Sequence, residues 1–446
     1  MGRRQPDEGA ATTALADGEV VDGAARPVRR APFSDNPALG ARGLRTQQRI
    51  LDGALQVFGE HGYDRATLDQ VAQAAGCSRV SIYQYFSGKD DLFRHLAGQV
   101  ARQLRASAEA LAPITPDADG WEAVRSWVGR YAEIHRRHAP VFRAFAAAAA
   151  SDAGLEGAAT STAMRDVAVL QARLTTAELP PRQLTPLIGV LVAAVSRAVD
   201  LASLLRAGAP DAYESERTDA AIADVVHRTL FGLQPGVNVR PPLDPPPRLL
   251  IGPVMTGLLD HVRELQTEAT LPGRRALAAL LEVGDDVVAQ RGYTGVRVDH
   301  VVDAAGVSHG AFYRYFENVD EFVRVVALRA FNDVATALAF LPERTDRASL
   351  RRWLREYHAV HLAKGPMIRV WVEAVEEVLR TDRPAVFDWG RRRMARLLAG
   401  RGFGDVEMDA VVLLATVEAF AYHEREPAEL DAVVRIVERA FLGRQA

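Results

Sequence analysis

Residues 78–85 concentrate side chains whose types suit contact with another molecule. The members that would be unusual in a core helix are Arg79, Val80, Ser81, Tyr83, Gln84 and Tyr85. Arginine can bind both acceptors on the major-groove edge of guanine, and a small hydroxyl fits a crowded groove. Tyrosine hydroxyls suit phosphate oxygens, as does the ammonium group of the nearby Lys89. This chemistry indicates recognition of double-stranded DNA.

A preceding short helix would hold this stretch in place. Thr67 with Gln70 three residues later has the pattern of a capping box. Apolar residues then recur at the spacing of one helix face, at Leu68, Val71, Ala72 and Ala75. Gly76 can adopt the positive φ that ends this helix, and Ser78 can cap the next one. Two short helices joined by a glycine turn predict a helix-turn-helix.

This segment resembles the N-terminal domain of TetR/AcrR-type transcriptional regulators. The resemblance rests on an ordered set: Arg49-Ile-Leu-Asp-Gly-Ala-Leu-Gln-Val-Phe58, Gly62-Tyr63, Thr67-Leu68, Val71-Ala72, Ala75-Gly76, Ser78, Tyr83, Tyr85-Phe86 and Lys89. It implies base contacts by Arg79, Val80 and Ser81. It implies phosphate contacts by Thr67, Tyr83, Tyr85 and Lys89, while Ser78 and Gln84 complete the predicted surface. The rings could instead only close a three-helix core, which we expect for Phe86, whereas Tyr83 should serve both roles.

The same pattern recurs 230 residues later. The repeated positions are Gly292-Tyr293, Asp299, Val301, Ala304-Ala305-Gly306, Ser308, Tyr313 and Tyr315-Phe316. Beyond them, Trp127, Tyr131, His135, Pro140 and Arg143 recur at a shift of 226 as Trp353, Tyr357, His361, Pro366 and Arg369. Both halves also end alike, at Arg228-Thr-Leu-Phe-Gly232 and Arg439-Ala-Phe-Leu-Gly443. The chain is therefore predicted to be a complete regulator that has been duplicated and fused.

The second copy departs from the first where contacts matter. Arg297 replaces Thr67, His309 replaces Arg79, Gly310 replaces Val80, Ala311 replaces Ser81 and Val319 replaces Lys89. Residues 41–105 carry nine basic and six acidic side chains, whereas residues 273–330 carry seven basic and eight acidic ones. The predicted DNA-binding residues of this copy are Ser308, His309, Ala311, Tyr313 and Tyr315. We expect it to bind DNA more weakly than the first.

Each half also carries a Trp-Tyr-His series at i, i+4 and i+8. The two series are Trp127, Tyr131 and His135, and Trp353, Tyr357 and His361. A stripe of rings at this spacing either packs in a core or, as the resemblance implies, lines a cavity for a largely apolar effector. The histidines lack acidic or cysteine partners at useful spacing, so no metal site is expected. No catalytic or phosphate-binding motif emerges, which argues against an enzyme and against a cofactor.

Composition bounds the remaining choices. The chain has 446 residues, 48% of them hydrophobic, and a net charge of −3, so DNA attraction must come from local patches. The single cysteine, Cys77, excludes an intramolecular disulfide and is expected to be a small buried residue of the turn. The longest apolar stretch, 187–205, contains Arg197 and Asp200 and is predicted to be a packed helix rather than a membrane span. A cytoplasmic protein without a secretory signal is expected.

The predicted fold is all-α, with two three-helix helix-turn-helix domains, each followed by a helical ligand-binding and dimerisation domain. The expected divisions are a disordered tail (1–40), a DNA-binding domain (41–98), a helical domain (99–232), a proline-rich linker with a bridging helix (233–272), a second DNA-binding domain (273–330) and a second helical domain (331–446). Helices in the last domain are predicted over 350–364, 367–379, 385–399, 408–424 and 428–441. Arginines before residue 46 could form a minor-groove arm.

Two hypotheses follow from these patterns. In the first, a monomer whose fused halves pack as a pseudo-dimer represses transcription and releases DNA when an unidentified effector changes the spacing of its two DNA-binding domains. In the alternative, the chain is a ligand-sensing or protein-interaction module with reduced or lost DNA binding. Activation instead of repression is equally compatible with the residues.

Overall fold

In the computed structural model, described residues are those at 40–63, 65–150, 153–175, 180–239, 244–252, 256–257, 260–261, 264, 271–291, 295–374, 382–421 and 427–444. No β-strand occurs among them, and one isolated β-bridge joins Ile114 and Leu174. The predicted all-α fold is confirmed. The predicted tail with the arginines that precede residue 40, most of the bridging helix over 254–268, and Gly292-Tyr293 lie outside the described residues. Arg42 and Arg45, which were also assigned to the arm, belong instead to the helix that begins at Ala41.

The first half forms a helix-turn-helix domain and a helical domain. The helices are α1 (Ala41–His61), α2 (Leu68–Ala74), α3 (Arg79–Tyr85), α4 (Lys89–Glu109), α5 (Ala118–Arg137), α6 (Ala139–Ala150), α7 (Ala153–Arg173), α8 (Pro181–Gly208) and α9 (Ser215–Phe231), with a 3₁₀ turn η2 (Asp211–Tyr213). Helix α4 begins at Lys89, one of the predicted phosphate contacts, and ends at Glu109, before Pro113.

The second half repeats this order. Its helices are α11 (Leu271–Arg291), α12 (Val298–Ala305), α13 (His309–Phe312), α14 (Val319–Ala339), α15 (Arg347–Ala374), α17 (Arg383–Leu397), α18 (Val406–Ala421) and α19 (Pro427–Ile436), followed by a π-helical turn, η4 (Val437–Phe441). One prediction is wrong. The helices expected over 350–364 and 367–379 are a single helix, α15, which continues through Pro366.

The helix around Pro366 is continuous in the second half, whereas the matching helix of the first half ends before Pro140, and the two segments make different contacts. In the first half the helix ends at Arg137, and His138 makes its side-chain hydrogen bond to Gln103, with 3.2 Å between the two nitrogens. At the matching position of the second half, Lys364 Nζ lies 2.5 Å from Asp285 of α11 and 3.5 Å from Asp333 of α14. Met367, the residue after Pro366, is buried in the core that α11 and α14 also form, so α15 packs against both helices as one continuous helix despite the hydrogen bond that proline removes.

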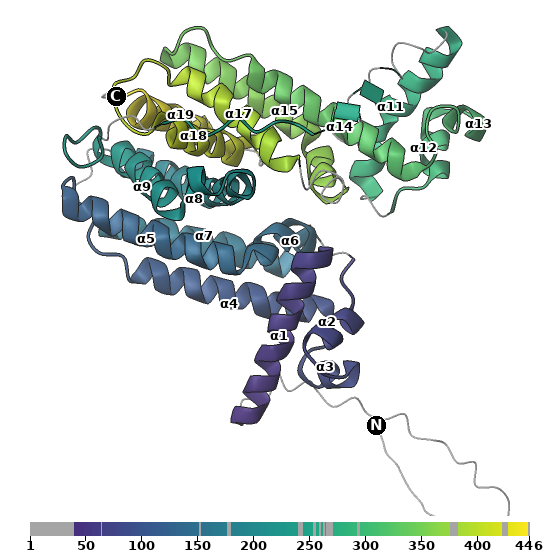
Figure 1. Cartoon of the computed structure of the whole chain (residues 1–446), viewed down its shortest axis with the longest axis horizontal. Helices are drawn as coiled ribbons and strands as arrows, with labels where there is room; N and C mark the ends of the chain where they lie inside the picture. Colours follow the sequence, from purple (N-terminus) through teal and green to yellow (C-terminus); the bar gives the residue numbers. More distant parts are fainter. Residues whose placement is uncertain are drawn as a thin grey trace, which may run out of the picture.

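The two halves pack against each other through α8 and α9 of the first and α17, α18 and α19 of the second (Figure 1). Helix α8 is the one described helix long and apolar enough to span a membrane. In this protein, 56% of its most apolar segment is buried, because α18 covers it. The prediction of a packed helix at 187–205 agrees with this position.

The helix-turn-helix domains relate differently to this body. The core of the first is continuous with the cores of both helical domains, from Ile50 through Phe93 to Phe441. The core of the second, built around Phe312, Phe316 and Phe322, is a separate cluster. Figure 1 shows the first domain below the helical body and the second at its right-hand end.

The described part of the linker lies along the second half. Asp388 of α17 accepts a hydrogen bond from the Leu249 backbone N–H at 3.2 Å, and Asp382 accepts one from the Gly252 N–H at 2.6 Å. Residues 244–252 form no helix, as the prolines predict. The linker is thus fastened to α17 as well as joining the halves.

Candidate nucleic-acid interface

Short-range hydrogen bonds set the ends of α2 and α3, the two helices of the first helix-turn-helix. Thr67 Oγ1 accepts from the Gln70 backbone N–H at 3.3 Å while Gln70 Oε1 accepts from the Thr67 N–H at 2.8 Å, so the predicted capping box is present. Gly76 has φ 60°, as the turn requires. Ser78 Oγ then caps α3 by accepting from the Ser81 N–H at 3.1 Å. The local sequence therefore accounts for the helix-turn-helix geometry.

A glycine brings the first two helices of this domain close together. A Cβ atom at Gly53 of α1 would lie 2.9 Å from the backbone nitrogen of Ala75. Only a residue without a side chain fits there, so the end of α2 approaches α1 closely. Phe58, Tyr63 and Phe93 pack together in the core of this domain, with ring centroids 5.0–6.0 Å apart.

The predicted DNA-binding residues differ in exposure. Thr67, Ser78, Arg79, Val80 and Gln84 are exposed, Ser81, Tyr83 and Lys89 are half-buried, and Tyr85 is buried. Val80 is 70% exposed, which is unusual for a valine on a helix that has a packed side. Phe86 is fully buried, so its expected core role is confirmed.

Arg79 is held against its own domain by two contacts. Its Nη1 lies 3.0 Å from Asp69 Oδ2 of α2, and its Nη2 donates to Tyr83 Oη at 3.3 Å. The guanidinium also lies 5.8 Å from the centre of the Tyr83 ring. These contacts raise the pKa of Arg79, first through the Tyr83 hydrogen bond and then through the charge of Asp69.

Lys89 lies at the first turn of α4 and is directed back toward Tyr63. Its Nζ donates to the Tyr63 carbonyl oxygen at 2.9 Å and lies 4.5 Å from the centre of that ring. Tyr63 in turn donates to Asp90 at 2.5 Å. One of the three ammonium N–H groups is therefore used to join α4 to the end of α1, a structural role that the sequence pattern did not reveal.

The second helix-turn-helix keeps the caps but shortens the recognition helix. Ser308 Oγ accepts from the Ala311 N–H at 3.3 Å, yet α13 comprises 4 residues where α3 comprises 7. Gly310 occupies the middle of this turn, and glycine disfavours helix by roughly 1 kcal/mol relative to alanine. His309 and Tyr313 are exposed, and Ala311 and Tyr315 are half-buried. The scaffold thus survives with less helix to place in a groove.

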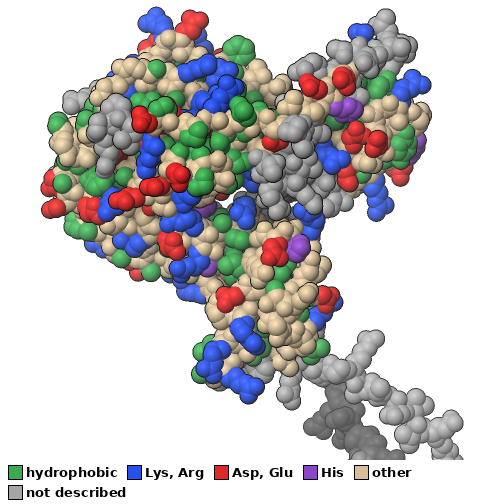
Figure 2. Space-filling view, viewed as in Figure 1, with side chains coloured by type: hydrophobic (Ala, Val, Ile, Leu, Met, Phe, Trp, Pro, Cys, Tyr) green, Lys and Arg blue, Asp and Glu red, His purple; other side chains and the backbone are tan. Residues whose placement is uncertain are grey.

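The two domains also differ in surface charge. Figure 2 shows basic side chains at the tip of the first domain and acidic side chains over the visible face of the second. This distribution agrees with the sequence, in which the first domain carries nine basic and six acidic residues and the second carries seven basic and eight acidic ones. Because phosphate contacts dominate affinity for DNA, the first domain is electrostatically better suited to it.

The family model described as bacterial regulatory proteins, tetR family, matches this chain twice, at residues 50–96 and 280–326. The chain carries two TetR-type helix-turn-helix domains. Each match covers one of the two helix-turn-helix domains described above, so the internal repeat predicted from the sequence is confirmed.

Individual relatives match longer stretches of the chain. The HTH-type transcriptional repressor Rv1474c of Mycobacterium tuberculosis is 38% identical over 92 residues, which are 19% of this chain and 49% of the relative. The repressor AcnR of Corynebacterium glutamicum is 33% identical over 115 residues, 24% of this chain and 59% of the relative. The chain thus spans about half the length of these relatives. The crystal structure of the TetR family regulator PfmR from Thermus thermophilus aligns with 40% of this chain and 97% of its own at 20% identity, with a TM-score of 0.32.

The Trp-Tyr-His series of both halves are buried. In the first, the Trp127 and Tyr131 ring centroids are 5.9 Å apart, and His135 lies 4.2 Å from Phe142. Burial raises the pKa of Tyr131 to about 12 and lowers that of His135. In the second, Tyr357 Oη and His361 Nε2 are 2.8 Å apart, and burial lowers the pKa of His361 to about 4. Trp353 packs beside Tyr357 with centroids 6.2 Å apart.

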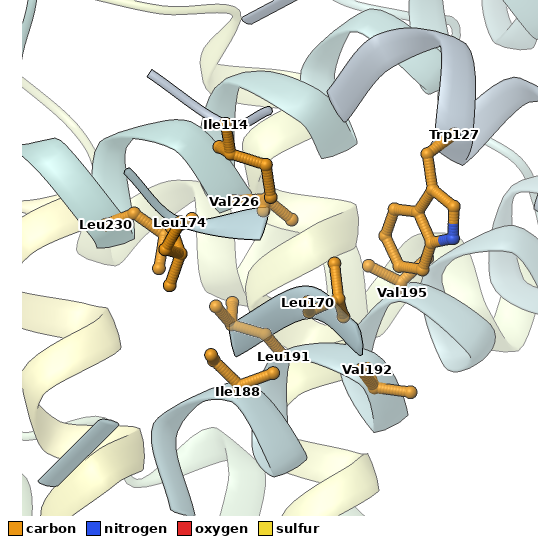
Figure 3. A pocket seen from close by; sticks show the side chains of 10 residues that line it. All are labelled: Ile114, Trp127, Leu170, Leu174, Ile188, Leu191, Val192, Val195, Val226 and Leu230. Carbon is orange, nitrogen blue, oxygen red and sulfur yellow. The ribbon is translucent and has the colours of Figure 1, made fainter. Parts of the chain in front are cut away.

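An apolar cavity lies beside the first series. Figure 3 shows the Trp127 indole at one end, with leucine, isoleucine and valine side chains around it that come chiefly from α7, α8 and α9. Its volume is about 20 Å³, which is room for roughly one water-sized molecule. Of the six residues proposed as pocket lining, Trp127 borders this cavity, whereas Tyr131, His135, Trp353, Tyr357 and His361 do not.

Trp127→Ala is expected to lower the free energy of unfolding by about 3–5 kcal/mol, because it deletes a nearly fully buried indole beside an existing void. Chemical denaturation followed by far-UV circular dichroism measures this loss. Phe340→Ala is the control, since that ring is 74% exposed and its removal should cost far less. Equal stability of the Trp127 variant and the parent would contradict the packing role.

Other candidate chemistry is sparse in the described part of the chain. Among those residues no group of three or more His, Cys, Asp or Glu side chains is placed to hold a metal ion. Cys77 is half-buried rather than fully buried as predicted. It nevertheless packs against the core of the first domain, and burial raises its pKa.

Proposed function

We propose that this protein is a DNA-binding transcriptional regulator, a repressor that acts in the cytoplasm and responds to a small, largely apolar effector. The observation that carries the proposal is the exposed face of α3, where Arg79, Val80 and Gln84 are accessible on the second helix of a well-capped helix-turn-helix. Transcriptional repression is the role named for the relatives Rv1474c and AcnR. Arginine and glutamine at such positions can read base edges, and an exposed valine can contact a thymine methyl group.

The fused halves are proposed to act as the two subunits of one pseudo-dimer. Charged pairs join α8 and α9 to the second half, at Arg197 with Glu418 (2.6 Å), Arg217 with Asp405 (2.7 Å) and Arg228 with Asp409 (2.7 Å). These pairs support an internal interface of the kind that would otherwise form between two chains. An operator with two unequal half-sites, an imperfect palindrome, would suit two unequal reading domains.

Light scattering on the purified protein tests this arrangement. We expect a monomer of 48.5 kDa, because the helices available for pairing already cover each other within one chain. A mass near twice that value would contradict the monomer and would indicate four reading domains on a longer operator.

Binding of an effector is proposed to oppose binding of DNA. An effector can do this only if it binds one spacing of the reading domains more tightly than the other. The cavity beside Trp127 is the described site best suited to an apolar compound, and it would have to expand to admit one. Titration of a DNA-bound complex with apolar compounds should identify those that release it.

A gel-shift experiment with the upstream region of the protein's own gene tests DNA binding itself. A specific shift, competed by the same sequence and not by unrelated DNA, is expected. If neither this region nor any sequence selected from random DNA is shifted, the alternative function, a ligand-sensing module, is favoured. The short α13 and the acidic surface of the second domain support that alternative for the second half.

A further inference from the structure

We propose that Asp69 is a specificity-determining residue, which acts by positioning the Arg79 guanidinium for a guanine edge and by disfavouring its use on phosphates. The inference rests on the proposed DNA binding and concerns how the first domain discriminates between sequences. Asp69 belongs to α2, the helix before the recognition helix, and lies ten residues from Arg79 in sequence.

The contacts of Arg79 leave the donors that a guanine needs. Nη1 bonds to Asp69 at 3.0 Å and Nη2 to Tyr83 at 3.3 Å, so two of five N–H bonds are used. Three N–H groups remain, one on each nitrogen of the guanidinium, and two of them can act as the fork that binds guanine O6 and N7. With both nitrogens tethered, the fork has fewer orientations to lose on binding.

Stability of the fold does not account for this pair. The side chains of Arg79 and Asp69 are 51% and 69% exposed, and ion pairs between exposed groups contribute little to folding. A carboxylate beside the reading helix also repels phosphate groups. It therefore weakens binding to every sequence, while the guanine contact that it prepares strengthens binding to one.

The second domain repeats the arrangement with a different reading residue. Asp299 and His309 stand at the positions of Asp69 and Arg79, and their Oδ1 and Nε2 atoms are 3.1 Å apart. A histidine ring has two nitrogens, and this contact occupies one. The second pair can thus offer a base a single ring nitrogen, whereas the first offers a fork.

The test begins with the full-length protein and its preferred sequence, selected from random double-stranded DNA. Each guanine of the selected site is then replaced in turn, and Kd is measured for every site at one salt concentration. The guanine read by Arg79 is the one whose replacement raises the Kd of the parent protein but leaves the Kd of the Arg79→Ala variant unchanged. Discrimination is the Kd for the site with that guanine replaced, divided by the Kd for the intact selected site.

For Asp69→Asn, we expect discrimination at that guanine to fall by about 5-fold or more, the scale of one bidentate base contact. Affinity for unrelated DNA should rise at the same time, because a negative charge is removed. In the Arg79→Ala background, the same substitution should leave discrimination unchanged while still raising affinity for unrelated DNA. A merely structural role for Asp69 would lower affinity for all sequences alike.

Asp299→Asn is the matched control in the same chain, since it removes the same charge from the equivalent position of the second domain. Its effect on discrimination should be smaller than that of Asp69→Asn. Unchanged discrimination in Asp69→Asn, in a protein that does select a sequence, overturns this inference alone. A parent protein that selects no sequence overturns the proposed function and the inference with it.

Discussion

Replacing Asp409 with alanine is expected to lower the free energy of unfolding by about 3–5 kcal/mol, because it removes one partner of a buried ion pair and leaves the other charge unpaired. Asp409 is 1% exposed, and the Arg228 side chain that it binds across the two halves is 0% exposed. A second arginine, Arg401, binds the same carboxylate, so the substitution strands two cations.

Aromatic and backbone atoms surround these two arginines closely. Phe403 lies against both, with guanidinium carbons 5.4 and 4.8 Å from its ring centre. Gly404, at φ 72°, passes so near that a Cβ atom would lie 2.5 Å from Arg228 Nη1. Since the site is packed in this way, relaxation around an unpaired arginine would be costly.

Urea denaturation of the intact chain, with secondary structure as the signal, measures the loss. Glu122→Ala is a suitable control, because Glu122 pairs with Arg125 on the surface of α5 with side chains 49% and 36% exposed. That change should cost less than about 1 kcal/mol. Similar losses in the two variants would show that the pair between the halves contributes no more than an exposed one.

Arg79→Ala is expected to weaken binding to the preferred operator by about 5-fold to 150-fold, the range that corresponds to 1–3 kcal/mol for a bidentate base contact. His309→Ala should cost clearly less. His309 offers fewer donors, it is paired with Asp299, and its helix has a single turn.

Both variants should be measured on one operator at one salt concentration, because affinity for DNA changes steeply with salt. Arg79→Ala should also relax the base preference in one half-site while leaving the other unchanged. Equal losses of operator affinity from the two substitutions would contradict the asymmetric model, in which one half-site has a strict base preference and the other a weak one.

Much of the DNA-binding domain was predictable from sequence because its signals are local. The Thr67 capping box, the Gly76 turn and the Ser78 cap each depend on atoms within three or four residues of one another. The repeat was equally visible, since it needs only a comparison of the chain with itself. The all-α fold follows from the helical spacing of apolar residues, which local backbone geometry imposes.

Tertiary structure decided what depends on residues far apart in sequence. Two helices were predicted on either side of Pro366, but α15 is one helix that packs against α11 and α14, with Met367 buried in their shared core. The spacing of the Trp-Tyr-His series could not show whether the rings line a cavity or pack in a core. In the folded chain, Trp127 is the one of these six residues that borders the cavity described above. The repeat marked Asp69 as a shared position, but the roles of Asp69 and Asp409 could not be inferred from sequence, because each depends on an arginine of another helix, in the second case 181 residues away. Local hydrogen bonds set where helices begin and end, whereas the partners of a charged side chain depend on how those helices pack.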